Sequence, residues 1–388
     1  MKKEKLERLN DLYNEEIKSE RLMGAQVRVY HKNKLVFSNV YGSDKEDSIY
    51  KIYSMTKPIT AVAFMILYER GLVDIMDPVE KYLPAYAGMK VVDGDGLRDA
   101  KSPILVKDVL NMTSGLVYPG DGNEPERIMD KLYADLHARA LAGEEMTNLK
   151  ILSELATVPL LFDPGESWRY GISADVVGGI VEAVSGMPYG EFLQKEIFEP
   201  LGMTDTGFYV PEVKIGRLAK MYTRKDESGR LRLANEKELE WLNEYAPTKK
   251  PFIESAGGGL YSSCSDYCKF ALMMLNGGEF NGAKILGRKT VEFIGSPQLD
   301  KKQLDTMKLG QIGGVQGYSY GNLNRVMVDS ALACSNGSVG EYGWDGLPGT
   351  YFCIDPQEEL VIVYMQQIQQ GGDYSLRRKM RQIVYSAL

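Results

Sequence analysis

A serine and a lysine stand three residues apart in the segment Ser54-Met55-Thr56-Lys57, where a β-rich opening gives way to apolar residues. From Met55 to Tyr68 these apolar residues recur at helical spacing, so the segment must begin a helix with a buried face. On a helix, residues three apart share one face, and a lysine there can take the proton of the serine hydroxyl. The pattern therefore indicates a covalent serine enzyme, although alone it would also fit a helix cap followed by a surface lysine.

A second match to the same spacing, Ser48-Ile49-Tyr50-Lys51, lies in a stretch that is predicted to be extended. In an extended chain, residues three apart point to opposite faces, so only Ser54 and Lys57 can touch. The chain contains only two histidines, His31 and His137, which leaves little material for a Ser-His-Asp relay. Lysine must then move the proton.

The composition of this 388-residue chain is that of a soluble globular protein, with 44% hydrophobic and 26% charged residues. Its net charge of −7 disfavours nucleic acid as a partner. No apolar run approaches the roughly 20 residues of a membrane span, and the amino terminus lacks the apolar core of a signal peptide. We therefore expect a cytoplasmic protein whose partner is a small molecule, with no membrane partner; the sequence leaves the oligomeric state open.

Four cysteines, Cys264, Cys268, Cys334 and Cys353, form no C-x-x-C pair. In a reducing interior they are expected to be core thiols and not a zinc site.

Strand-like segments lie near both ends of the chain, and helical periodicity dominates the middle to about residue 200. We expect a hairpin over residues 26–30 and 34–40, later strands over 258–262, 349–354 and 360–365, and a basic terminal helix from Tyr374. Strands at both ends usually build one sheet with the helical segment inserted. The expected division is a sheet domain of residues 1–56 and 205–388, an inserted mainly helical domain of residues 57–204, and an active site at their interface.

Two further segments follow in order. Pro164-Gly165-Glu166-Ser167-Trp168-Arg169-Tyr170 precedes a helix predicted over residues 173–185, and Gly343-Trp344-Asp345-Gly346-Leu347-Pro348-Gly349-Thr350 precedes strands. With Ser-x-x-Lys, this order resembles the serine β-lactamase and penicillin-binding protein superfamily, in particular its class C-like esterase branch. In that family the second motif begins with Tyr and the third is K-T-G or W-x-G. The resemblance implies an α/β (α+β) fold of the β-lactamase/transpeptidase type, an antiparallel sheet flanked by helices with an inserted all-helical domain.

The resemblance also implies roles for individual residues. Ser54 is the acylated nucleophile, Lys57 accepts or relays its proton, and Tyr170 is the second acid/base group, expected to share one proton with Lys57. The backbone N–H groups of Ser54 and Leu347 form the oxyanion hole. The implied substrate-binding residues are Trp344, Asp345, Gly346, Ile172 and Ser173. Taken alone, without the order of the three motifs, Tyr170 would be interpreted as a buried aromatic residue. Residues 343–346 would likewise be interpreted as a turn with a buried indole.

Two departures from the family pattern bear on the substrate. Tyr170-Gly171-Ile172 replaces the usual Y-x-N or Y-x-S, with Ser173 one residue late as a substitute, and Trp344 replaces the lysine of β-lactamases and peptidases. That lysine would help to hold a substrate carboxylate. Both changes favour a neutral acyl group against an aromatic wall.

The sequence therefore predicts a serine hydrolase that forms an acyl-enzyme on Ser54, an esterase acting on small or medium esters. The alternatives are a β-lactamase or D-amino-acid peptidase, an acyltransferase that prefers an alcohol or amine acceptor, and a catalytically silent ligand-binding homologue. No metal or organic cofactor is implied, because the covalent mechanism needs neither.

Overall fold

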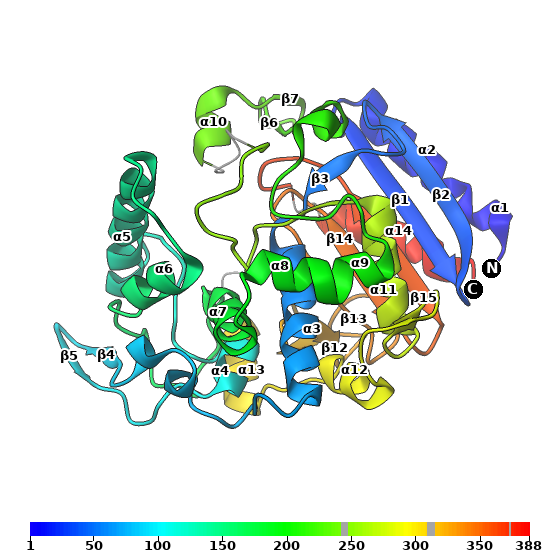
Figure 1. Cartoon of the computed structure of the whole chain (residues 1–388). Helices are drawn as coiled ribbons and strands as arrows, with labels where there is room; N and C mark the ends of the chain where they lie inside the picture. The colour runs from blue at the N-terminus through cyan, green and yellow to red at the C-terminus, as the bar shows by residue number, and fades with distance from the viewer. Residues whose placement is uncertain (242–246, 309–314, 372–373) are drawn as a thin grey trace.

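The computed structural model describes residues 1–241, 247–308, 315–371 and 374–388. Its centre is a seven-stranded antiparallel sheet in the order β11-β12-β13-β14-β15-β1-β2 (Figure 1). The strands are β1 (Gly24–His31), β2 (Lys34–Gly42), β11 (Tyr318–Gly321), β12 (Asn324–Met327), β13 (Tyr342–Asp345), β14 (Tyr351–Asp355) and β15 (Leu360–Met365). Both ends of the chain thus build one sheet, as predicted.

The two ends meet where β1 pairs with β15, with Gln26 opposite Met365. The predicted amino-terminal hairpin is present as β1 and β2. Lys32 and Asn33 at its turn have φ values of +52° and +60°, which suit the tight turn of a two-residue hairpin. His31, expected in the turn, instead ends β1.

Alternate side chains of β15 enter two different hydrophobic cores, as the two-residue period of a strand requires. One core lies under α11 (Cys264–Leu275), and the other lies under α2 (Arg8–Lys18) and α14 (Tyr374–Ser386) (Figure 1). The side chains entering the first core are Val361, Val363 and Met365, and those entering the second are Leu360, Ile362 and Tyr364. Because helices cover both faces, β15 is buried along its whole length.

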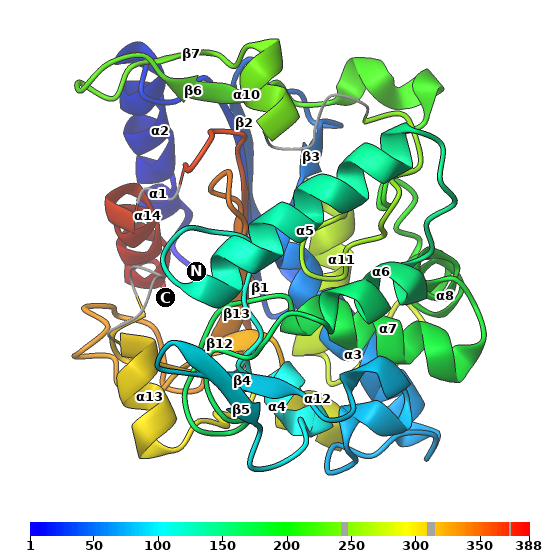
Figure 2. The same cartoon turned by 90° about the vertical axis from the view of Figure 1, so that its left-hand side faces the viewer.

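The segment between the first strands and residue 204 is mostly helical (Figure 2). Its α-helices are α3 (Thr56–Glu69), α4 (Val106–Leu110), α5 (Glu124–Leu141), α6 (Asn148–Leu155), α7 (Ser173–Ser185), α8 (Tyr189–Leu193) and α9 (Glu199–Leu201). Two short 3₁₀ helices, η2 (Val79–Lys81) and η3 (Pro84–Tyr86), and a π-helical segment, η4 (Gln194–Phe198), complete it. The predicted helices at 55–68 and 173–185 are confirmed as α3 and α7, which contact each other. A hairpin of β4 (Lys90–Asp93) and β5 (Gly96–Asp99) lies between η3 and α4. The bounds of the two domains stay a prediction.

A small ladder outside the large sheet positions the start of α3. β3 (Ile49–Lys51) pairs with β8 (Tyr261–Ser263), whereas residues 258–262 were predicted as a strand of the main sheet. The remaining elements are α1 (Lys3–Leu6), η5 (Glu212–Arg217), β6 (Tyr222–Arg224), β7 (Leu231–Leu233), α10 (Glu236–Trp241), β9 (Glu279–Phe280), β10 (Ala283–Lys284), α12 (Arg288–Ile294) and α13 (Lys301–Lys308). Within the described ranges, no helix is long and apolar enough to cross a membrane.

The cysteines divide into two groups. Cys264, Cys268 and Cys353 are buried free thiols, as predicted. Cys334 is exposed, so the prediction of a core thiol is wrong there, because the residue lies in a turn between β12 and β13 with a φ of +48°.

The ion pair that fastens α14 to the sheet provides a test of the fold. Arg381 donates to Glu341 at 2.6 Å, and the two side chains are only 5% and 2% exposed. Arg381→Met leaves a buried carboxylate without its cation, so we expect a loss of about 3–5 kcal/mol of unfolding free energy in urea titration. The control Arg288→Met breaks an exposed pair with Glu292 and should cost about 0–1 kcal/mol. Equal losses in the two variants would contradict this assignment.

Candidate active site

Ser54 lies in η1 (Tyr53–Met55), the turn that joins β3 to α3. The residue before it, Tyr53, has a φ of +43°, a region that a non-glycine residue occupies at a cost of about 1–3 kcal/mol. The surrounding structure holds this strained turn, since the N–H of Ile52 donates to the carbonyl of Leu260 at 3.0 Å beside the β3–β8 ladder. The strain is located at the residue that presents Ser54 to the site.

Lys57 is fully buried one turn after Ser54, and its Nζ has three polar neighbours. These are Ser54 Oγ at 3.1 Å, Tyr118 OH at 3.0 Å and the carbonyl oxygen of Gly257 at 2.6 Å. Burial lowers the pKa of Lys57 to about 7, and the nearby Asp175 carboxylate offsets part of that effect. An uncharged amine has two N–H groups, which Tyr118 and Gly257 can accept, and its lone pair is then left for the proton of Ser54.

Ser48 and Lys51, the second match to the Ser-x-x-Lys spacing, have partners outside the site. Ser48 Oγ accepts the N–H of Lys45 at 2.9 Å, and Lys51 Nζ donates to the carbonyl of Gly259 at 3.1 Å and lies 4.1 Å from the ring centroid of Tyr261.

Tyr170 precedes α7 and covers Lys57, whose Nζ lies 4.5 Å from the centroid of the phenol ring. Its OH accepts the indole N–H of Trp344 at 3.1 Å and is hydrogen-bonded to Ser54. Burial raises the pKa of Tyr170 above its ordinary value, and these two hydrogen bonds offset only part of the rise. With its pKa raised, Tyr170 keeps its proton near pH 7 and lies as a proton donor beside Ser54. The sharing of one proton with Lys57 stays a prediction.

The phenol that directly contacts Lys57 is Tyr118, which the sequence motifs did not single out. Its ring lies 5.6 Å from that of Tyr170, and burial raises its pKa well above the ordinary value. In the sequence Tyr118 is one of 24 tyrosines. No local signal in the sequence distinguishes it from the others.

Asp175 is a second residue that sequence reasoning missed. This buried carboxylate in the first turn of α7 accepts the hydroxyl of Ser255 at 2.7 Å and the N–H of Gly257 at 3.1 Å. A Cβ at position 257 would lie 2.7 Å from the Asp175 carboxylate and 2.8 Å from the Tyr118 hydroxyl, so only glycine fits between them. Asp175 thus fixes the peptide whose carbonyl faces Lys57.

The backbone groups predicted for the oxyanion hole lie on two neighbouring turns. In the ranges that the structure describes, the N–H groups of Ser54 and Leu347 enter no backbone hydrogen bond. Thr350 joins the turns, since its hydroxyl lies 3.4 Å from the Ile52 carbonyl and its own carbonyl accepts the Gly346 N–H at 2.9 Å. A Cβ on Gly346 would lie 2.4 Å from the Ile52 carbonyl oxygen, so glycine permits this close approach.

The other residues predicted to bind substrate have partners within the protein. The buried Trp344 donates to Tyr170, and the Asp345 carboxylate is paired with Arg325 at 3.0 Å and with Arg377. Trp344 therefore orients a phenol of the site, and Asp345 joins β13 to β12 and α14.

Ile172 and Ser173 are fully buried at the start of α7. The Ser173 hydroxyl lies 2.8 Å from that of Ser114, so it links α7 to the loop before Tyr118 and has no exposed surface for a ligand.

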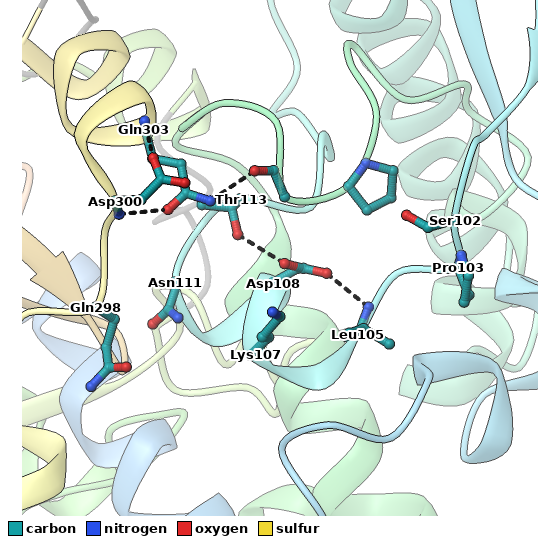
Figure 3. Close-up of a pocket in the computed structure, with 12 residues that line it drawn as sticks. Ser102, Pro103, Leu105, Lys107, Asp108, Asn111, Thr113, Gln298, Asp300 and Gln303 are labelled. Carbon is teal, nitrogen blue, oxygen red and sulfur yellow. Dashed lines mark hydrogen bonds between the residues drawn. The ribbon is translucent and has the colours of Figure 1, made fainter.

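A polar cavity of about 420 Å³ lies apart from these residues, near α4 and α13 (Figure 3). Asp108 in its wall has both oxygens engaged, one by the Leu105 N–H at 2.9 Å and one by the Thr113 hydroxyl at 3.1 Å. The lining residues are Ser102, Pro103, Leu105, Lys107, Asp108, Asn111, Thr113, Pro164, Gly165, Gln298, Asp300 and Gln303. Neither Ser54 nor any neighbour of Lys57 is among them.

Known proteins resemble this chain along most of its length. A family model described as Beta-lactamase matches residues 9–385. Protein Rv1367c of Mycobacterium tuberculosis is 31% identical over 362 residues, covering 89% of this chain and 86% of that protein. Esterase EstB of Burkholderia gladioli is 27% identical over 400 residues, covering 98% of this chain and 95% of that protein. The solved structure of EstCE1, described as a hydrolase with promiscuous acyltransferase activity, shares the fold with a TM-score of 0.82 and 21% identity over 99% of each chain.

The pKa of Lys57 predicts how the reactivity of Ser54 depends on pH. Because the amine must be uncharged to accept a proton, labelling of Ser54 by a fluorophosphonate should rise about tenfold per pH unit below pH 7 and level off above it. Labelling rates measured by intact mass between about pH 5 and pH 9 test this, with Ser48→Ala as a variant that keeps the same profile. A flat profile, or a rise centred near the ordinary lysine pKa of about 10.4, would contradict it.

The two phenols should affect that profile differently. Tyr118→Phe removes an acceptor that stabilises the ammonium form, so the midpoint should fall by about 0.5–1 pH unit. Tyr170→Phe removes a proton donor beside Ser54, so the plateau of the labelling rate should fall about 10²- to 10⁴-fold while the midpoint stays in place. A lower plateau in Tyr118→Phe together with a shifted midpoint in Tyr170→Phe would contradict these two roles.

Proposed function

This chain belongs to the β-lactamase family and is a serine hydrolase, and we propose that it is an esterase that forms an acyl-enzyme on Ser54 with small or medium esters. The observation that carries the proposal is Lys57, a fully buried amine with a pKa of about 7 whose Nζ lies 3.1 Å from Ser54 Oγ. Such an amine is a base at neutral pH, and it lies within reach of the proton that it must take.

In the proposed acylation, Ser54 Oγ bonds to the ester carbonyl carbon while its proton passes to Lys57. The carbonyl oxygen becomes an oxyanion that the N–H groups of Ser54 and Leu347 stabilise. Collapse of this intermediate breaks the bond to the alkoxide, which takes a proton from the neutral phenol of Tyr170. Lys57 then returns its extra proton to Tyr170, so the acyl-enzyme forms with both groups restored.

Deacylation repeats these steps with water as the nucleophile. Lys57 takes a proton from water as the water oxygen attacks the acyl carbon. Ser54 leaves and takes a proton from Tyr170, which Lys57 then reprotonates. The whole cycle consumes one ester and one water and releases one alcohol and one acid, and no step uses a metal or organic cofactor.

The charges near the third motif support an uncharged acyl group. Trp344 occupies the position where the related lactamases and peptidases carry a lysine, and its indole N–H donates a hydrogen bond to Tyr170. The neighbouring Arg325 and Arg377 are paired with Asp345. A substrate carboxylate would therefore have to compete with Asp345 for a cation, which disfavours penicillins and D-Ala peptides. The relative EstB of Burkholderia gladioli is named an esterase, which supports the same choice.

An acyltransferase is the second candidate, because the same acyl-enzyme can react with an alcohol or amine in place of water. The description of EstCE1 as a hydrolase with promiscuous acyltransferase activity supports it. We propose that the protein is located in the cytoplasm. All four of its cysteines are free thiols, which is typical of a reducing compartment.

The proposal is tested by the mass of the protein after treatment with a fluorophosphonate, together with turnover of short p-nitrophenyl esters. Wild type and Ser48→Ala should each gain one adduct and keep full turnover. Ser54→Ala should gain none and lose at least about 10³-fold in turnover, because the nucleophile is gone. Undiminished turnover in Ser54→Ala would contradict the proposal.

The alternatives give different results in the same assay. Faster turnover of a chromogenic cephalosporin or of D-Ala amides than of esters would favour the lactamase or peptidase. Preferential formation of a new ester when an alcohol is added would favour the acyltransferase. Tight ligand binding that Ser54→Ala leaves unchanged, with no adduct in wild type, would favour the silent binding protein.

A further inference from the structure

Two consecutive glutamines, Gln366 and Gln367, follow the last residue of β15 and lie inside the protein. Their exposed fractions are 3% and 4%. Glutamine is usually exposed, and a buried amide must find hydrogen-bond partners, so its partners show what it holds in place. Neither residue belongs to the motifs that identify the site.

Gln366 is bound to the turn that carries Leu347. Its Nε2 donates to the carbonyl of Pro348 at 3.0 Å and to that of Gly371 at 2.7 Å, and the Tyr364 hydroxyl donates to its Oε1 at 2.5 Å. The N–H of Gly371 in turn donates to the carbonyl of Leu347 at 3.2 Å. The carbonyls of Leu347 and Pro348 are therefore both held from the end of β15.

The close fit of this contact depends on Gly349, which has a φ of +92°. A Cβ there would lie 1.8 Å from the Gln366 Nε2, so a side chain at position 349 would displace the amide. The position of the Gln366 amide therefore requires glycine at position 349.

Gln367 holds the strand that leads to Ser54, whose N–H is the second donor of the proposed oxyanion hole. Its Nε2 donates to the carbonyl of Lys51 at 2.9 Å. Lys51 is the last residue of β3, two residues before the strained Tyr53 and three before Ser54. The backbone carbonyl of Gln367 accepts the N–H of Tyr222 at 2.9 Å, which fixes Gln367 itself.

We infer that Gln366 and Gln367 are positioning residues that together set the spacing between the N–H groups of Leu347 and Ser54. Because Gln366 and Gln367 are consecutive residues, the segments before Ser54 and around Leu347 are both hydrogen-bonded to the same point of the chain, the end of β15. Neither side chain touches the substrate. This inference rests on the proposed function, since it assigns the two N–H groups to the oxyanion.

The spacing matters more for the transition state than for the bound ester. Each donor must lie about 2.7–3.1 Å from the position that the oxyanion reaches, and loss of one such donor costs about 10²- to 10³-fold in kcat. A displacement of about 1 Å can cost 10²-fold by itself. Loosening of either turn should therefore lower kcat and leave KM nearly unchanged.

The experiment compares Gln366→Met and Gln367→Met with wild type in the full chain. Methionine keeps the length of the side chain and removes its hydrogen bonds. We expect each variant to lose about 10- to 10²-fold in kcat on a short p-nitrophenyl ester, with KM within about twofold. The rate of Ser54 labelling by a fluorophosphonate should fall by a similar factor. The midpoint of the pH profile should stay in place, because Lys57 keeps its contacts.

Gln26→Met is the matched control. Gln26 is 1% exposed in β1, lies opposite Met365 of β15, and donates to the backbone carbonyl of Lys45. Its loss should lower the Tm comparably and leave kcat unchanged. Should the variants at 366 and 367 lower kcat no more than Gln26→Met does, the inference is overturned.

Gln366→Glu is a second variant at this position, to be measured if Gln366→Met does not fold. It keeps the shape of the side chain while removing the amide donor that two carbonyls share, and kcat should again fall with KM unchanged. Wild-type kcat in this variant would overturn the inference. Failure of wild type to label on Ser54 would instead contradict the proposed function, so the two failures are distinguishable.

Discussion

The burial of the Lys57 amine beside Ser54 is the contact on which the rest of the site depends. Removal from water lowers its pKa to about 7 and makes it a base, which an exposed lysine is not at neutral pH. The same shift opposes folding. Because the unfolded chain holds the proton more tightly, the penalty is complete below about pH 7 and fades as the pH rises toward the unfolded value of about 10.4.

The fold offsets this penalty, and the cost of the strained Tyr53, with ordinary contacts. α3 contacts α7, the β3–β8 ladder fixes the chain before η1, and Asp175 holds the Gly257 peptide against the amine. Pairing of β1 with β15 joins the two ends of the chain in one sheet. From the end of β15, Gln366 also contacts the turn of Leu347, and Gln367 contacts the strand that precedes Ser54, the two segments of the proposed oxyanion hole.

The parts of the molecule that could be predicted are those with a local signal. Periodicity indicated α3, α7, β15 and the hairpin of β1 and β2, and the ordered motifs indicated Ser54, Lys57 and Tyr170, whose catalytic roles stay proposals. Tyr118, Asp175 and Gln366 carry no local signal, because each acts through partners far away in the sequence. The roles of Trp344 and Asp345 within the protein depend on Tyr170, Arg325 and Arg377, which no spacing rule connects.

The quantity to measure first is the pKa of Lys57 itself. Lysine labelled with ¹³C at Cε allows each amine to be titrated by NMR, and the resonance missing in Lys57→Arg identifies the one that matters. This resonance should titrate near pH 7, well separated from those of the exposed lysines. A midpoint near 10.4 would mean that Lys57 is an ordinary ammonium at neutral pH, and the proposed activation of Ser54 would then be contradicted.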